Sequence, residues 1–404
     1  MATSLALGIG ANTAIFSIFD RILLQPLPVS DTASLVNLAA PGPKPGSNSC
    51  NQAGDCDVVF SYPMFRDLER AQTVFTGLAA HRIGGANVSA RGQTLNTDLV
   101  QVSGSYFPTL GVQPALGRLL TPADDTAPGG HPVVVLSHAF WTSQFGADPA
   151  LLNEPIVVNG TSFTVVGVAA RGFEGTTTGA RPDLFVPISM REVVSPGWKG
   201  FENRRSYWVY VFGRLKPGVS IEQARAALEP VYRGIITDVE APLQTGMSDQ
   251  TMARFKTKPL LLEEGGRGQS GVHEEARTPL LMLLAVTTLV LLTACANVAN
   301  LLLARAAGRA GEMAVRLSIG AGRRQLVTQL LVESCTLAVA GGLAGLLVAR
   351  WTLALVASFL PPFATGVMPQ SLEPRVLLFA LAVSIVTGIV FGLYPACTRR
   401  APIW

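Results

Sequence analysis

Three long apolar stretches, with one charged residue among them, most constrain what this chain can fold into. Residues 280–304 contain no charged residue, residues 326–349 contain only Glu333, and residues 376–394 contain none. A helix needs about 20 apolar residues to cross the hydrocarbon core of a bilayer, so each stretch is long enough to span it. Buried helices of a large soluble core are the alternative. They are disfavoured because all three stretches lie close together in the last third of the chain.

The start of the chain is a fourth, weaker candidate. Residues 1–24 are rich in Ala, Ile, Leu and Gly and carry no charge before Asp20. The basic N-terminal region and the small-residue cleavage site of a signal peptide are both missing. We therefore expect a transmembrane helix over residues 1–25, truncated at its cytoplasmic end.

Arginine sets the predicted topology. The segment 305–324 carries a single acidic residue, Glu312, against five arginines: Arg305, Arg309, Arg316, Arg323 and Arg324. Two more arginines follow the last span, whereas residues 357–374 contain no Lys or Arg. Positive loops face the cytoplasm, so the 305–324 loop and the C-terminus are predicted inside and residues 26–278 outside. The predicted fold is four transmembrane α-helices, with a large α+β extracytoplasmic domain inserted between the first and second.

The inserted segment has mixed periodicity. Residues 26–57, rich in Pro, Gly, Ser and Asn, are predicted to be loop-like. Asn159-Gly160 fits a type I′ turn and predicts a hairpin of 156–158 with 162–168. Ser220 and Gln223 form a capping box that begins a helix. Further strands are expected at 132–136, 184–188 and 207–212, and a further helix at 139–145. This mixture favours an α+β domain over a doubly wound one.

Composition excludes several classes of function. Charged residues make up only 14% of the chain, against about 25% in a soluble domain. A net charge of +4 is too small and dispersed for nucleic-acid binding. Neither a phosphate-binding P-loop nor a nucleophile elbow occurs, and the four histidines are scattered. We therefore expect no catalytic residues, no cofactor, no metal site and no enzymatic activity in this chain.

Small residues and cysteines suggest structural contacts. Gly341 and Gly345, and likewise Gly388 and Gly392, have the four-residue spacing that lets helices approach closely. Asn297 and Asn300 lie three residues apart in the second span. We favour a role in hydrogen bonding to another helix over a role in a gate or a substrate-binding surface. Cys50 and Cys56 flank a short loop on the predicted outer side. An oxidising compartment would permit a disulfide there, and two free thiols are the alternative.

The cytoplasmic loop 305–325 has a helical pattern. Glu312 and Arg316 form an i, i+4 pair in the favourable order. Gly320 ends the pattern, and Arg323 and Arg324 lead into the next span. Two interpretations stay open from the pattern alone: a solvated basic loop that only sets topology, or an element that docks on a cytoplasmic partner.

At these residues the sequence resembles a known family. Residues 312–334, EMAVRLSIGAGRRQLVTQLLVES, are similar to the signature of the FtsX-type permease domain. Residues 5–28 resemble the first helix of MacB-like permeases, and residues 133–173 and 213–228 resemble their periplasmic core domain. The nearest resemblance is to duplicated permeases in which two such halves run in tandem. The resemblance divides the chain into a first helix (1–25), a MacB-like periplasmic core domain (26–278) and an FtsX-like permease domain (279–404).

The resemblance implies a permease subunit of a mechanotransmitting (type VII) ABC system in the bacterial inner membrane. The expected partners are a cytoplasmic ATPase on another chain, a second permease unit (a homodimer or a paralogue), a periplasmic adaptor and membrane lipid. The loop residues Glu312, Arg316, Gly320, Arg323 and Arg324 would dock on the ATPase. Unlike MacB itself, this sequence has no fused ATPase domain, and it stops early, so a fragment of a longer permease is expected. A membrane-bound extracytoplasmic sensor without transport activity is the alternative function.

Overall fold

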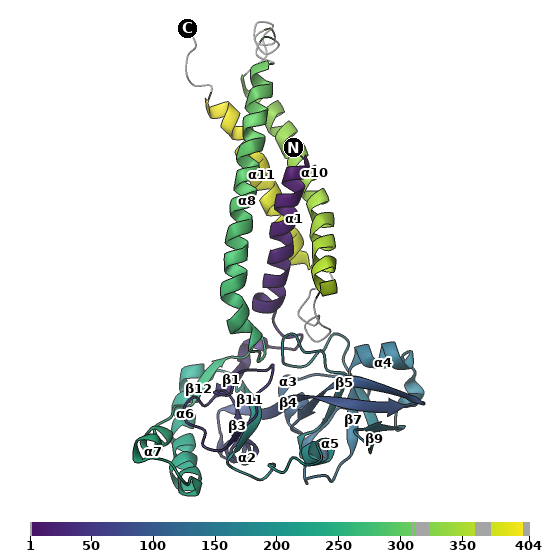
Figure 1. The fold of residues 1–404 in the computed structure, drawn as a ribbon, viewed down its shortest axis with the longest axis vertical. Helices are drawn as coiled ribbons and strands as arrows, with labels where there is room; N and C mark the ends of the chain where they lie inside the picture. The colour runs from purple at the N-terminus through teal and green to yellow at the C-terminus, as the bar shows by residue number, and fades with distance from the viewer. Residues whose placement is uncertain (1, 309–310, 312–314, 316–322, 360–372, 399–404) are drawn as a thin grey trace. The chain divides into compact units, whose positions relative to one another are not determined.

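The computed structural model describes residues 2–308, 311, 315, 323–359 and 373–398. The chain separates into two compact units (Figure 1). The helical unit comprises Met1–Leu24 and His273–Trp404, and the inserted unit comprises Gln25–Val272. The inserted unit is therefore one continuous piece of chain, placed between the first helix and the rest of the helical unit.

Four long helices make up the described part of the helical unit: α1 (Ala2–Phe19), α8 (Val272–Gly308), α10 (Arg323–Phe359) and α11 (Pro374–Thr398). The chain after α1 continues as a π-helical turn, Asp20–Leu24. Among the described residues, three helical stretches are long and apolar enough to cross a membrane: Thr3–Leu24, Glu275–Asn297 and Ala338–Phe359. The described apolar stretch of α11, Pro374–Thr387, is shorter.

Helix α10 continues beyond residue 349, where the sequence suggested that the third span ends. It passes through the exposed Arg350 and Trp351 and runs to Phe359. Arginine is a good helix former, so one charged residue at the edge of an apolar run does not stop a helix. The described apolar stretch of this helix, Ala338–Phe359, therefore includes ten residues beyond the predicted end of the span.

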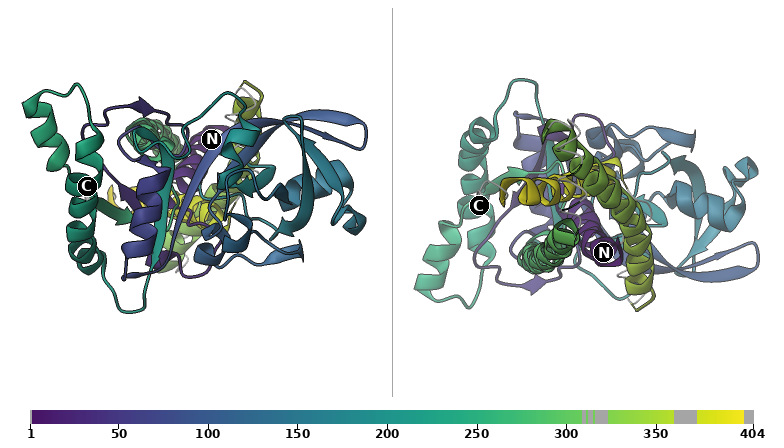
Figure 2. Two further views of the ribbon diagram at one scale, coloured as in Figure 1. Left: turned by 90° about the horizontal axis from the view of Figure 1, so that it is seen from below. Right: turned by 90° about the horizontal axis from the view of Figure 1, so that it is seen from above.

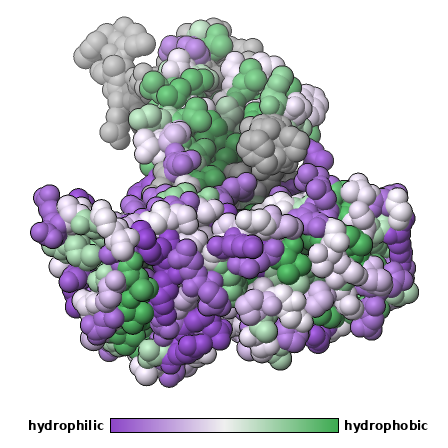
Figure 3. Space-filling model, turned by 60° about the horizontal axis from the view of Figure 1, so that its bottom comes forward, coloured by the Kyte–Doolittle hydropathy of each residue, from purple (hydrophilic) through white to green (hydrophobic). Residues whose placement is uncertain are grey.

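The helical unit exposes large apolar side chains. Leu289 on α8 is 65% exposed, Leu343 on α10 is 64% exposed and Leu378 on α11 is 65% exposed. Figure 3 shows apolar residues gathered on the surface of these helices. A soluble protein rarely exposes apolar surface on this scale, whereas a bilayer would cover it.

The inserted unit is built on one mixed sheet. Within residues 25–272, all of which the structure describes, twelve strands follow the order β12-β1-β11-β4-β5-β10-β7-β9-β6, with β2 and β3 against β11 and β8 against β4 and β9. The strands are β1 (Leu35–Ala39), β2 (Ser47–Asn48), β3 (Phe60–Ser61), β4 (Phe75–Ala90), β5 (Gln93–Val102), β6 (Pro114–Gly117), β7 (Val133–Leu136), β8 (Pro155–Val158), β9 (Thr161–Ala169), β10 (Leu184–Pro187), β11 (Ser206–Leu215) and β12 (Leu261–Glu264).

Helices cover both faces of this sheet (Figure 2). The helices are α2 (Tyr62–Ala71), α3 (Tyr106–Leu110), α4 (His138–Phe145), α5 (Arg191–Val194), α6 (Ile221–Gly234) and α7 (Asp249–Lys256). Helices α2 and α6 share one apolar core with β11, through Phe65, Leu228 and Trp208. Helix α3 lies in a second core with β4, β5 and the other face of β11. Helix α4 belongs to a third core, with β7, β8 and β9.

The two ends of the inserted unit meet. Strand β1 pairs antiparallel with β12, so that Val36 lies opposite Glu264 and Ala39 opposite Leu261. Just outside this ladder, the backbone N–H of Leu27 donates to the carbonyl of Gly266 at 2.9 Å. The segment that enters the unit is therefore hydrogen-bonded to the segment that leaves it.

Several local predictions match the structure. Strands β8 and β9 form the expected hairpin, and Asn159 and Gly160 both have positive φ, as a type I′ turn requires. Ser220 and Gln223 form the predicted capping box at the start of α6. The helix expected over 139–145 begins one residue earlier, because Ser137 caps it by accepting from the backbone N–H of Phe140.

The prediction that residues 26–57 are loop-like was wrong in part. Strand β1 lies within this segment, between β12 and β11 in the sheet. Its sequence, Leu-Val-Asn-Leu-Ala, is apolar enough for a buried strand, and the prolines that suggested a loop lie on both sides of it, at 26 and 28 and at 41, 43 and 45. The long hairpin of β4 and β5 was not predicted, since Gly84, Gly85 and Asn87 interrupt its apolar pattern.

Candidate functional site

The predicted ATPase-docking residues are only partly covered by the structure. Glu312, Arg316 and Gly320 lie outside the described residues. Arg323 and Arg324 form the first residues of α10, and only their backbone is described. Their assignment to ATPase docking remains a prediction.

Glycine brings α1 and α10 into close contact. A Cβ atom added to Gly345 would lie 3.2 Å from the carbonyl oxygen of Ala6, and one added to Gly10 would lie 2.8 Å from the carbonyl oxygen of Gly345. On the neighbouring face of α10, a Cβ added to Gly342 would run into the Ser384 side chain of α11. Gly341 is buried in α10 as well. For Gly388 and Gly392 only the helical backbone of α11 is described.

A polar cluster joins α1 to α8. The side chain of Asn12, 2% exposed, donates to the backbone carbonyl of Thr287 at 2.9 Å. The hydroxyls of Thr287 and Thr288 donate to its amide oxygen at 3.2 and 3.1 Å. Polar side chains in a span commonly bond across helices in this way. Asn12 was not among the predicted contact residues, although Asn12 and Thr13 form a polar pair within the first apolar run.

The asparagines that were singled out behave differently. Asn297 and Asn300 are both exposed on α8 in the single chain. Polar groups within a span normally face protein or water rather than lipid. Their exposure leaves this face of α8 available to a further protein surface.

A buried carboxylate follows α1. Asp20 is 2% exposed and begins the π-helical turn. Its carboxylate lies 3.9 Å from the guanidinium of Arg375 of α11. This ion pair links the chain after the first helix to the start of the last.

Cys50 and Cys56 form a disulfide in the structure, with Cα atoms 5.1 Å apart. The loop between them is anchored to β11, because the Tyr210 hydroxyl accepts from the backbone N–H of Asn51 at 2.7 Å and donates to the carbonyl of Gly54 at 2.7 Å. The bridge thus closes a loop that hydrogen bonds already hold against the sheet.

Charged side chains are buried beside α6 and α7. Arg204 bridges Asp67 at 2.7 Å and Glu240 at 2.9 Å. Glu240 is fully buried, and burial raises the pKa of its carboxyl despite the guanidinium. Burial also lowers the pKa of Lys258 to about 7, with Lys44 adding to the effect and Glu240 opposing it. These groups hold the α6–α7 region to the sheet rather than forming an open catalytic site.

A shallow cleft of about 210 Å³ opens beside α2. Its lining mixes both signs of charge, with Arg66 and Arg70 from α2 facing Asp125 and Glu202 from the loops opposite. Burial raises the pKa of the Asp125 carboxyl, although backbone N–H groups of Ser189 and Gly104 donate to it. Among the described residues, no group of three or more His, Cys, Asp or Glu could hold a metal ion.

Two family descriptions match the chain. Residues 1–231 match the MacB-like periplasmic core domain, and residues 284–401 match the FtsX-like permease C-terminal domain. The first match covers α1 and most of the inserted unit, and the second covers most of α8 and the helices that follow.

Individual relatives are distant. The macrolide export ATP-binding/permease protein MacB of Bradyrhizobium diazoefficiens is 26% identical over 54% of this chain and 32% of its own length. The pyoverdine export ATP-binding/permease protein PvdT of Pseudomonas entomophila is 24% identical over 78% of this chain and 43% of its own. The uncharacterized ABC transporter permease YvrN of Bacillus subtilis is 25% identical over 73% of this chain and 66% of its own.

The chain therefore spans less than half of the length of either export protein named above. Among solved structures, the periplasmic region of MacB from Actinobacillus actinomycetemcomitans overlaps 58% of this chain and 90% of its own, with 14% identity and a TM-score of 0.41.

Proposed function

Because this chain belongs to the family of ABC transporter permeases that join a MacB-like periplasmic core domain to an FtsX-like permease domain, we propose that it is the permease subunit of a mechanotransmitting (type VII) export system. In this proposal a separate cytoplasmic ATPase hydrolyses ATP, and the permease converts that motion into movement of the inserted unit outside the membrane. The observation that carries the proposal is the pair of family matches, which together cover most of both units of the chain.

Three features support a separate ATPase. The sequence has no P-loop with which to bind ATP. It does have a basic segment, 305–324, with a helical charge pair and a glycine stop. The named export relatives combine ATP-binding and permease functions in one longer protein, of which this chain matches only a part. The docking residues are Glu312, Arg316, Gly320, Arg323 and Arg324.

Pairing with a second permease unit, either a second copy or a paralogue, is part of the same proposal. Asn297 and Asn300 would be costly against lipid, and both are exposed on α8 in the single chain. A partner helix would remove them from the hydrocarbon. A periplasmic adaptor would complete the export path, and the complex would lie in the bacterial inner membrane with the inserted unit outside.

A membrane-bound sensor is the second candidate. The sheet and clefts of the inserted unit could bind a signal, but the described helical unit offers no output domain on the other side. The two candidates differ in their partner: an ATPase supports the permease, and a kinase supports the sensor.

The test is co-purification of the detergent-solubilised chain with an ATPase from its native host. We expect Arg316→Glu to insert normally, because four arginines remain in the loop to set topology. It should nevertheless lose ATPase binding and transport, because like charges at an interface cost several kcal/mol, about a hundredfold or more in affinity. Gly320→Val should act similarly, since a β-branched residue resists the positive φ expected where a helix stops.

Arg277→Glu is the matched control, because it reverses one exposed arginine that is predicted to lie outside the membrane. It should keep wild-type ATPase binding. The purified chain alone should not hydrolyse ATP. If Arg316→Glu and Gly320→Val both retain binding and activity, the loop only sets topology.

A further inference from the structure

The β4–β5 hairpin has one unpaired edge. A two-residue turn, Arg91-Gly92, joins the two strands, and the first residue pair beside this turn is Ala90 opposite Gln93. On the outer side of β4, Val88 and Ser89 pair with β8. On the outer side of β5, β10 begins to pair only at Leu99. The stretch Gln93–Thr97 therefore pairs with a strand on one side only, because the carbonyl of the next residue, Asp98, is already bonded to the N–H of Asp183.

The direction of its backbone groups follows from the ladder. In an antiparallel hairpin, alternate residues bond across the pair and the others point outward. Asp98 is an outward residue, because its carbonyl accepts from the N–H of Asp183 at 2.8 Å. Thr94 and Asn96 share this alternation, so their N–H and C=O groups also point away from β4. Within the described chain, these groups have no other backbone partner.

This edge lacks the usual protection. Soluble sheets blunt free edges with lysine, proline or a bulge. The sequence Gln-Thr-Leu-Asn-Thr contains no Lys or Pro, and its pairing with β4 is regular. Thr94 and Asn96 are both exposed. The edge can accept another strand.

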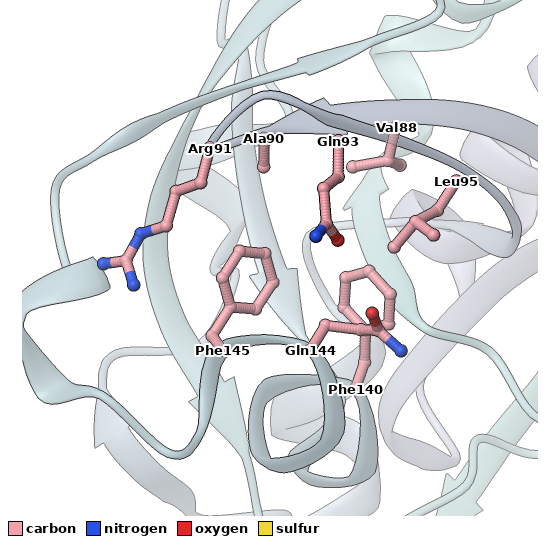
Figure 4. Close-up of a pocket in the computed structure, with 8 residues that line it drawn as sticks. All are labelled: Val88, Ala90, Arg91, Gln93, Leu95, Phe140, Gln144 and Phe145. Carbon is pink, nitrogen blue, oxygen red and sulfur yellow. The ribbon is translucent and has the colours of Figure 1, made fainter.

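A pocket lies beside the same edge (Figure 4). It has a volume of about 220 Å³, between the hairpin and α4. Its lining is mixed: Phe140 and Phe145 of α4 and Val88 and Leu95 of the hairpin supply apolar contacts, whereas Arg91, Gln93 and Gln144 supply polar ones, and the Gln93 side chain points into it. The side chain of Leu95 lies on the face of β5 that borders the pocket. The residue of an added strand opposite Leu95 would place its side chain on the same face. The pocket therefore suits one aliphatic side chain from such a strand.

Two carboxylates mark the other end of the edge. Burial and the neighbouring Asp98 raise the pKa of Asp183 to about 6, and burial raises the pKa of Asp98. Neither carboxylate has an ion pair in the described part of the chain. By contrast Arg91, at the turn, is already paired with Asp148 at 2.8 Å. A cation beside Asp98 and Asp183 would be stabilised.

We propose that the free edge of β5, Gln93–Thr97, binds an extended peptide segment of a partner protein as an added strand. An aliphatic side chain of this segment fills the Phe140–Phe145 pocket, and a lysine or arginine three residues away meets Asp98 and Asp183. The residue of the added strand opposite Leu95 places its side chain at the pocket, and the third residue beyond it follows the end of the free edge, next to Asp98 and Asp183. Backbone bonds supply affinity and the two side chains supply selectivity. The inference does not depend on the export function.

The probe is a fluorescent, end-capped peptide, Lys-Thr-Thr-Leu-Thr-Thr-Lys, which places a lysine three residues from the leucine in either direction. Fluorescence polarisation with the full-length protein in detergent should show saturable binding. Asn96→Pro removes an outward N–H that the hairpin does not use, and it should weaken binding about tenfold, as expected for one or two lost hydrogen bonds. Asn96→Ala keeps the backbone group and should bind within about twofold of the parent.

Two further variants separate the contacts. Ala90→Phe should weaken binding by filling the pocket, because Ala90 lines it. Asp98→Asn should weaken the lysine peptide but not a version with glutamine in place of lysine. Unchanged thermal midpoints will show that the variants fold. The proposal is overturned if the parent shows no saturable binding, or if Asn96→Pro and Asn96→Ala bind alike.

Discussion

Lys258 shows how strongly one residue is governed by its surroundings. Its side chain is 4% exposed, and the Nζ atom lies 4.5 Å from the centre of the Phe255 ring. A neutral amine suits this site better than an ammonium, so burial lowers its pKa to about 7. Nothing in the local sequence Lys-Thr-Lys-Pro distinguishes it from the exposed Lys256.

This shift predicts the pH dependence of stability. In the unfolded chain Lys258 holds its proton up to pH of about 10.5, whereas in the folded protein it releases the proton near pH 7. Between these values unfolding takes up a proton, so raising the pH opposes unfolding. The inserted unit should therefore become more stable from pH 7 to pH 9, as measured by denaturant unfolding followed by tryptophan fluorescence. Lys44, whose pKa falls to about 8, acts in the same direction.

Lys258→Met should flatten that dependence, and Lys256→Met is the matched control because its side chain is exposed. If the free energy of unfolding of Lys258→Met rises with pH as steeply as that of the parent protein, the proton is taken up by another group.

At the scale of helices, the close contact of α1 with α10 depends on glycine. Gly345→Leu would force a side chain against the backbone of α1, where even a Cβ atom lies 3.2 Å from the Ala6 carbonyl. Overpacking of this kind costs about 1–3 kcal/mol, so thermal unfolding in detergent should shift to lower temperature. Ala340→Leu, on an exposed face of α10, should leave the midpoint unchanged. Equal midpoints for the two variants would mean that the helices do not cross at Gly345.

Local chemistry explains which elements could be predicted. The β8–β9 hairpin and the start of α6 have a turn or cap whose residues determine the geometry by themselves. Strands β4 and β5 have weaker signals, because their distal halves alternate small and polar residues and depend on α4 and β8 for burial. Strand β1 was not predicted because prolines lie on both sides of it. The β5 edge emerges only from the order of the sheet, which no short motif encodes.

For the whole molecule, arginine asymmetry makes a testable statement about sidedness. A cysteine replacing Ala314, within the basic segment, should be protected from a membrane-impermeant thiol reagent added outside intact cells. A cysteine replacing Gln250, in the inserted unit, should react. Reaction of the cysteine at position 314 in intact cells would show that the predicted topology is inverted. At this scale the sequence predicted the apolar helices and the long insertion, since hydropathy acts over whole segments.

The paired ends of the inserted unit have an evolutionary consequence. Since β1 lies against β12, and Leu27 bonds to Gly266, the chain leaves this unit beside the point where it enters. Insertions are tolerated when the two ends of the inserted piece already lie together, because the host then needs to open only a small gap. A lineage could therefore exchange, enlarge or delete this unit while the helices that carry it keep their own sequence and packing.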